Sequence, residues 1–219
     1  MKLYKYPQED LWAEISKRPV FEKEALEDTV KNIISEVNAS KDEALFRFNE
    51  KFDGAILEKL EVTEAEIETA RNSVSAELKT AINLAKENIE KFHASQKEDT
   101  VIVETTPGVQ CWRKSVGIEK VGLYIPGGTA PLFSTILMLG VPAKLAGCKE
   151  IVLCTPPNKE GIINPAILYT ANLVGISKIF KVGGAQAIAA MACGTETIPA
   201  VDKIFGPGNQ FVTKAKELV

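Results

Sequence analysis

Three glycine-containing breaks in the second half of the chain have the composition of ligand-binding loops. They are Pro126-Gly127-Gly128-Thr129, Gly183-Gly184-Ala185-Gln186 and Gly206-Pro207-Gly208-Asn209. Glycine lets a ligand approach the backbone closely, and the N-terminus of the helix that follows offers unpaired amides to a phosphate. The pattern therefore predicts a nucleotide or dinucleotide site. The alternative is that the breaks are tight turns that bind nothing.

Three polar side chains at these breaks are the candidate ligand contacts. Tyr124 ends an apolar strand, where it could pack in the core with a tethered hydroxyl or stack and bond at the rim. Gln186 and Asn209 each fall in the first turn of a helix. A carboxamide there can cap its own helix or bond a ribose or phosphate. The usual dinucleotide fingerprint is not satisfied, because Phe211 stands where its third glycine belongs.

The sequence shows no familiar catalytic set. It contains no HExxH or GxSxG motif, no Walker loop and no Ser-His-Asp arrangement. The single histidine, His93, falls near the end of a long helical pattern, where a structural role is expected. With one histidine and no CxxC pair, the chain is poorly equipped to build a zinc site alone. We therefore expect neither catalytic nor metal-ligating residues within it.

The elements that position the candidate residues repeat as strand, break and helix after residue 100. The predicted strands cover 121–125, 151–154, 178–182 and 202–205. The predicted helices cover 132–146, 165–174, 185–193 and 210 onward. The strands lack polar alternation, which is typical of a parallel sheet with helices on both faces. The pattern predicts a doubly wound α/β fold, in which ligands bind at the carboxyl ends of the strands.

Glycines and capping residues predict where the helices begin and end. We expect Gly147, Gly175 and Gly194 to end their helices in the left-handed conformation. Capping boxes at residues 40–43 (Ser-Lys-Asp-Glu) and 63–66 (Thr-Glu-Ala-Glu) each predict a helix start. These boxes belong to the first part of the chain, which is charged, poor in glycine and helical in its periodicity.

The remaining patterns divide the chain into two regions. Asp53-Gly54 predicts a helix end, and residues 55–62 form a possible short strand. Two short apolar runs around Thr106-Pro107-Gly108 predict a hairpin. We place the boundary near residue 100, with a helical region over 1–99 and an α/β region over 100–219. The second region stops on a helix without a cap or a following strand, so we expect its sheet to be incomplete.

Composition argues against several classes of partner. The chain has 26 Lys and Arg against 29 Asp and Glu, a net charge of −3, which gives no electrostatic reason to bind nucleic acid or an anionic membrane. It has no apolar run of about 18 residues, and its start lacks the apolar core of a signal peptide. The cysteines form no dense framework and indicate reduced thiols in a cytoplasmic protein; they are Cys111, Cys148, Cys154 and Cys193.

Three long motifs resemble the histidinol dehydrogenase family. They cover residues 121–135, 183–189 and 202–209, and weaker matches cover residues 88–93 and 145–148. The resemblance implies an incomplete Rossmann-like, NAD-binding sheet over residues 100–219, similar to that of aldehyde dehydrogenases. It also implies that the family's NAD-contacting Tyr, Gln and Asn correspond to Tyr124, Gln186 and Asn209.

The same resemblance implies an activity. The family oxidises L-histidinol to L-histidine through histidinaldehyde in two NAD-dependent steps, as a zinc-dependent homodimer that ends histidine biosynthesis. Its zinc ligands and its Glu–His acid–base pair lie further along the chain than Val219. We therefore expect the N-terminal portion of such an enzyme, inactive alone. Two alternatives are a non-catalytic NAD-binding or assembly module, and an α/β domain whose glycine turns serve packing only.

Overall fold

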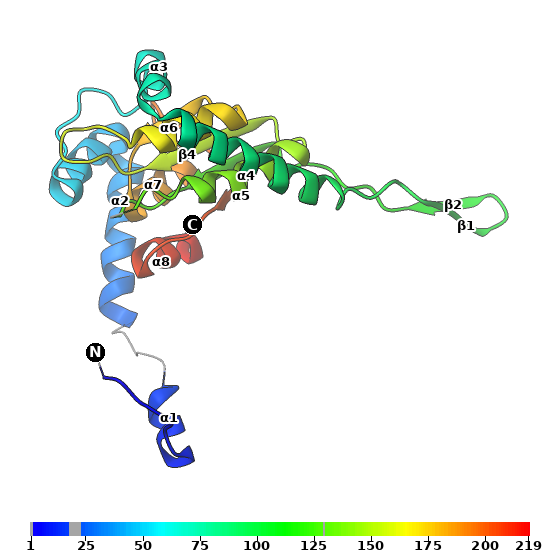
Figure 1. The fold of residues 1–219 in the computed structure, drawn as a ribbon, viewed down its shortest axis with the longest axis horizontal. Helices are drawn as coiled ribbons and strands as arrows, with labels where there is room; N and C mark the ends of the chain where they lie inside the picture. Colours follow the sequence, from blue (N-terminus) through cyan, green and yellow to red (C-terminus); the bar gives the residue numbers. More distant parts are fainter. Residues whose placement is uncertain (1, 18–22, 129) are drawn as a thin grey trace.

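A four-stranded parallel sheet in the order β5-β4-β3-β6 forms the centre of the structure (Figure 1). The structure is a computed structural model that describes residues 2–17, 23–128 and 130–219. The strands are β3 (Lys120–Tyr124), β4 (Glu150–Thr155), β5 (Lys178–Lys181) and β6 (Lys203–Phe205). The chain leaves β3 on one side through β4 and β5, and it returns as β6 on the other side of β3. Ligands bind beside such a reversal in open α/β sheets.

A helix follows each strand of the sheet. These helices are α5 (Phe133–Leu145), α6 (Pro165–Val174), α7 (Gly184–Cys193) and α8 (Gln210–Leu218). The ends of these strands and helices agree with the predicted ends to within one residue. The prediction of a doubly wound α/β fold is therefore confirmed. No helix of the described residues is long and apolar enough to cross a membrane.

Two apolar cores lie on opposite faces of the sheet. Tyr124, Cys154 and Phe180 of successive strands belong to the core that includes α7 and α8. Their neighbours Leu123 and Ile179 belong to the other core, which includes α5 and α6. Because successive residues of a strand point to opposite faces, a strand that is covered on both sides has no polar alternation.

The helices of the first hundred residues contribute to both layers. They are η1 (Glu9–Leu11), α1 (Trp12–Ile15), α2 (Lys23–Phe48), the π-helix η2 (Asn49–Asp53), α3 (Glu64–Ser73) and α4 (Ala76–Ala94). Helix α2 packs on α7 and α8, whereas α3 packs on α6 and α4 packs on α5. As a result, α2 and η2 reach the side of the sheet on which α7 and α8 lie.

One predicted capping box is confirmed, and the other marks a helix start whose cap comes from a distant part of the chain. Thr63 Oγ1 accepts a hydrogen bond from the Glu66 amide, and Glu66 bonds back to the Thr63 amide. The helix start predicted at residues 40–43 is confirmed, because α2 consists of two helical segments that meet at a non-helical residue, Lys41 (φ 47°, ψ −127°). There the Asp42 amide donates to Glu196 Oε2 over 3.0 Å. A carboxylate from the α7–β6 loop thus caps the first amide of the second segment.

Two shorter elements differ from the rest of the sheet. The predicted strand at 55–62 is reduced to a single antiparallel bridge between Glu61 and Phe180, with the Val62 amide donating to the Ile179 carbonyl over 2.9 Å. The predicted hairpin is confirmed as β1 (Ile102–Thr106) paired antiparallel with β2 (Val109–Trp112). It extends far from the body of the molecule (Figure 1).

The predicted glycine helix ends are confirmed except in one detail. Gly147 and Gly175 have φ of 82° and 81°. Gly194 also has a positive φ, 71°, but its ψ of 147° is extended rather than left-handed helical. The chain there turns directly into the 195–198 loop, where the Thr195 amide donates to the Ile198 carbonyl over 2.8 Å.

Candidate functional site

A cavity of about 670 Å³ lies at the carboxyl ends of β3 and β4, against the first turns of α7 and α8. All three glycine-containing breaks line it, with Gly127, Gly184 and Asn209 among their residues. The N-terminal helices complete it with Phe52 and Asp53 of η2, among others. The described residues of the three breaks therefore meet at one cavity; Thr129, which belongs to the first break, lies outside the described residues.

Tyr124 forms part of the cavity wall and is also a core residue. Its side chain is 3% exposed, and its Oη accepts a hydrogen bond from the Gly184 amide over 3.0 Å. Burial raises the pKa of Tyr124, opposed by this amide and assisted by the charge of Asp53, so the residue is a neutral phenol near neutral pH. Because the oxygen accepts from Gly184, its proton remains available for an acceptor in the cavity.

Gln186 is held against the start of α7. Its residue is 2% exposed, although it lines the cavity. Within the described residues no side chain caps α7, so Gln186 does not cap its own helix. Gly184 has φ 64°, and a Cβ there would lie 2.5 Å from Gln186 Oε1. Glycine at position 184 therefore gives the carboxamide its room and leaves it to face the cavity.

Asn209 has the capping role that the sequence left open. Its Oδ1 accepts from the Phe211 and Val212 amides over 3.0 and 3.1 Å, at the N-terminus of α8. The Nδ2 group of the same carboxamide is left to donate elsewhere, since capping occupies only the oxygen. The expectation of unpaired amides is thus wrong for α8 in its first turn, because the chain supplies its own acceptor.

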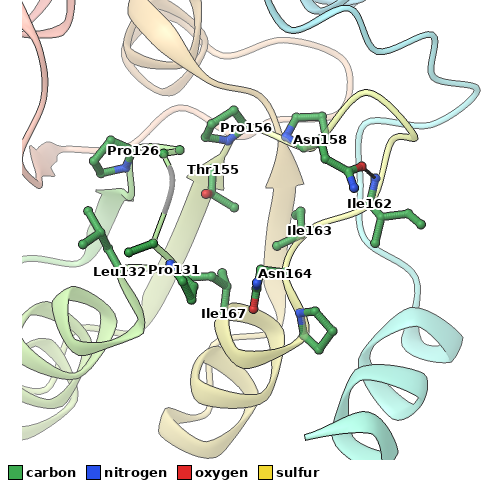
Figure 2. A pocket seen from close by; sticks show the side chains of 15 residues that line it. Pro126, Pro131, Leu132, Thr155, Pro156, Asn158, Ile162, Ile163, Asn164 and Ile167 are labelled. Carbon is green, nitrogen blue, oxygen red and sulfur yellow. Dashed lines mark hydrogen bonds between the residues drawn. The ribbon is translucent and has the colours of Figure 1, made fainter.

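A second, smaller cavity of about 330 Å³ adjoins the first (Figure 2). The two share the proline and glycine residues that follow β3 and β4, namely Pro126, Gly127, Gly128, Pro156 and Pro157. The smaller cavity lies on the α5 and α6 side and is lined by Thr155, Asn158 and Asn164. Asn158 Oδ1 accepts from the Ile162 amide over 2.7 Å, and Asn164 Oδ1 accepts from the Ala166 amide over 2.9 Å.

This second cavity was not predicted from the sequence. The Thr-Pro-Pro break after β4 was visible, but nothing in the local pattern distinguished Asn158 or Asn164 from ordinary turn and capping residues. The useful signal was the proline directly after Asn164, which marks a helix N-terminus with an asparagine cap at the end of a buried strand and its loop.

Asp53 is the other lining residue that the sequence analysis missed as a candidate. It ends the π-helix, and Gly54 follows with φ 68°. Its Oδ2 is buried and has no hydrogen-bond partner among the described residues. Burial raises the pKa of Asp53 to about 6. An Asp-Gly pair is a common helix end, so the local sequence gave no reason to expect a ligand-facing carboxylate.

The described part of the chain brings together no group of three or more His, Cys, Asp and Glu side chains that could hold a metal ion. His93, near the end of α4, has a glutamine as its side-chain partner: its Nδ1 lies 2.7 Å from Oε1 of Gln96 in the turn that follows the helix. The residues present therefore do not fit a zinc site, and we assign no zinc ligand to them.

These observations define an α/β domain of the doubly wound class with a ligand cavity at its strand ends. The profile described as histidinol dehydrogenase matches residues 16–219. The chain belongs to the histidinol dehydrogenase family.

Relatives and a solved structure agree with this assignment. The chain is 63% identical over 219 residues to the histidinol dehydrogenase of Bacteroides thetaiotaomicron, covering 100% of this chain and 51% of that protein. It is 56% identical over 196 residues to the Pasteurella multocida protein, covering 90% and 45%. The crystal structure of histidinol dehydrogenase from Elizabethkingia anophelis matches with a TM-score of 0.91 and 57% identity, over 97% of this chain and 49% of that one. The chain spans about half the length of the curated relatives it matches.

Proposed function

We propose that this chain is the NAD-binding portion of a histidinol dehydrogenase, which oxidises L-histidinol to L-histidine in two NAD-dependent steps at the end of histidine biosynthesis. The observation that carries the proposal is the convergence of Tyr124, Gln186 and Asn209 on one cavity of about 670 Å³. The polar character of these three residues at the glycine-containing breaks made them candidate ligand contacts, and the family resemblance assigned them to NAD. Their meeting at the carboxyl ends of parallel strands supports that role independently.

The donors and acceptors in the cavity suit a dinucleotide. Tyr124 holds a phenol proton that its bond to Gly184 does not use, and Asn209 holds a free Nδ2 group. Gln186 offers both an oxygen and an amino group beside them. When bound, NAD would supply the acceptor for the hydride that leaves the substrate. The residues of this chain would bind and orient the cofactor. The volume of the cavity, about 670 Å³, lies within the usual range for small-molecule sites.

We propose that the proton transfers of the reaction rest on groups that this chain does not supply. The described residues form no ligand set for the zinc of the family. Incubation of the 219-residue chain with NAD, zinc and L-histidinol is expected to give no NADH absorbance. Steady turnover under these conditions would contradict the proposal that the chain provides only the cofactor side.

Association with a second polypeptide is the other part of the proposal. The hairpin presents apolar side chains to solvent, including Ile102 (59% exposed), Val109 (50%) and Trp112 (59%). Exposed apolar surface of this kind marks interaction sites, which supports the homodimer expected of the family. The same surface equally favours the alternative of a non-catalytic assembly module. Mixing this chain with a second chain that carries the rest of a relative's sequence, and assaying for restored activity, would test that alternative. The four free thiols support a reducing cytoplasm as the place of action.

Calorimetric titration of the chain with NAD tests the cofactor role. Wild-type protein is expected to bind NAD, and Gln186→Ala is expected to weaken binding about tenfold through the loss of its hydrogen bonds. Gln96→Ala is the matched control, because Gln96 is exposed in the turn after α4 and is not among the lining residues. A folded wild-type protein that gives neither heat nor thermal stabilisation with NAD would favour glycine turns that serve packing alone.

A further inference from the structure

Asp53 is a carboxylate that the fold brings to the cavity without giving it a partner. It lines the cavity with Tyr124, and its buried Oδ2 accepts no hydrogen bond within the described ranges. A buried carboxylate without a partner is unfavourable unless something else satisfies it. The preceding turn is a π-helix, and such turns are rare and often occur at functional sites.

The position of Asp53 is relevant because the end of β4 has no acidic residue. In doubly wound NAD sites, an acidic residue at the end of the second strand bonds the adenosine ribose. The second strand of this sheet is β4, and it ends in Thr155-Pro156-Pro157, none of which is acidic. Pro156 and Pro157 line the same cavity as Asp53. An acid from the N-terminal helices therefore lines the same cavity as this strand end, which has no acid of its own.

The charged groups in the described lining of the cavity are of one sign, negative. Asp53 is its only charged residue among those described, and Lys, Arg and His are all missing from that part of the lining. A site without a cation has nothing to neutralise a phosphate placed beside a carboxylate, whereas ribose hydroxyls can donate to that carboxylate without charge repulsion. The chemistry favours a nucleoside with free hydroxyls and disfavours one that carries a 2′-phosphate.

We propose that Asp53 is the specificity-determining residue of the cofactor site: its carboxylate accepts hydrogen bonds from the hydroxyls of the adenosine ribose and rejects the 2′-phosphate of NADP. This inference rests on the proposed NAD-binding function and extends it. The N-terminal helical region thereby contributes to cofactor recognition as well as to packing, because η2 supplies the acid that β4 does not.

Titration of NAD and NADP into wild type, Asp53→Asn and Glu50→Gln tests the proposal. Glu50 is an exposed carboxylate of the same π-helix and is not among the lining residues, so it controls for general charge. Wild type and Glu50→Gln should prefer NAD over NADP. Asp53→Asn should weaken NAD binding about tenfold and leave NADP binding unchanged or tighter, so that the preference collapses.

The outcomes separate the two proposals. If wild type binds NAD and Asp53→Asn keeps the wild-type preference, the role of Asp53 is overturned while the cofactor site stands. If wild type does not bind NAD, both are overturned. Asp53→Ser, which also removes the charge, provides the same comparison if Asp53→Asn does not fold.

Discussion

Replacing Asp53 with asparagine is expected to stabilise the chain near neutral pH. The pKa of this carboxyl rises from 3.8 to about 6 on folding because the protein buries it. A raised carboxyl pKa stabilises the fold below the unfolded value and loses that contribution as the pH rises through the folded value. At neutral pH the fold therefore carries an ionised, buried group that asparagine would replace with a neutral one of the same shape.

The shift sets the size of the expected effect. A rise from 3.8 to about 6 corresponds to about 3 kcal/mol at most. Because the residue is only partly buried and lines an open cavity, solvent screening reduces this to about 1 kcal/mol. The advantage of Asp53→Asn over wild type should be small at about pH 4 and approach about 1 kcal/mol at about pH 8.

Urea denaturation at a series of pH values measures this difference directly. The free energies of unfolding of wild type and Asp53→Asn are compared at each pH, with Glu50→Gln as the control for net charge. We expect the difference to grow with pH for Asp53→Asn and to remain flat for the control. A flat difference for both variants would mean that the Asp53 carboxyl is fully solvated and that the raised pKa is wrong.

Substitutions at three further positions test the geometry of the site. Asn209→Asp should keep the cap of α8 and the melting temperature while losing the Nδ2 donor and weakening NAD binding, whereas Asn209→Ala should also lose about 1 kcal/mol by denaturation. Tyr124→Phe leaves the Gly184 amide without its acceptor and should cost about 1–2 kcal/mol in the same assay. Gly206→Ala should destabilise the fold by about 3 kcal/mol or prevent soluble expression, because a Cβ there would overlap the Tyr124 carbonyl. Wild-type stability in this last variant would mean that the β6 break is looser than described.

The sheet and its helices could be predicted from the sequence because their signals are local. Each buried strand is a short apolar run, and Gly147 and Gly175 end their helices through their own backbone preference. The three candidate residues converge because parallel strands end at one edge, which topology alone dictates once the strand-helix repeat is recognised.

The features that sequence reasoning missed depend on partners far away in the chain. The kink at Lys41 exists because Lys41 Nζ bonds the Gly194 carbonyl and Asp42 bonds the hydroxyl of Thr197. Asp53 resembles an ordinary helix end until α7 and α8 enclose it in a cavity. Neither contact has a local signature, so only the assembled fold could identify them.

The charge of the cavity depends on the number of residues in one helical turn, the π-helix η2. Its turn over Asn49–Asp53 holds one more residue than an α-helical turn would. Removing one residue of that turn would take out the extra residue and restore ordinary winding, so the backbone bonds from the Gly54 and Ala55 amides to the Asn49 carbonyl would have to form anew. The position of the only negative charge in the described lining therefore depends on a single extra residue that lies outside the sheet.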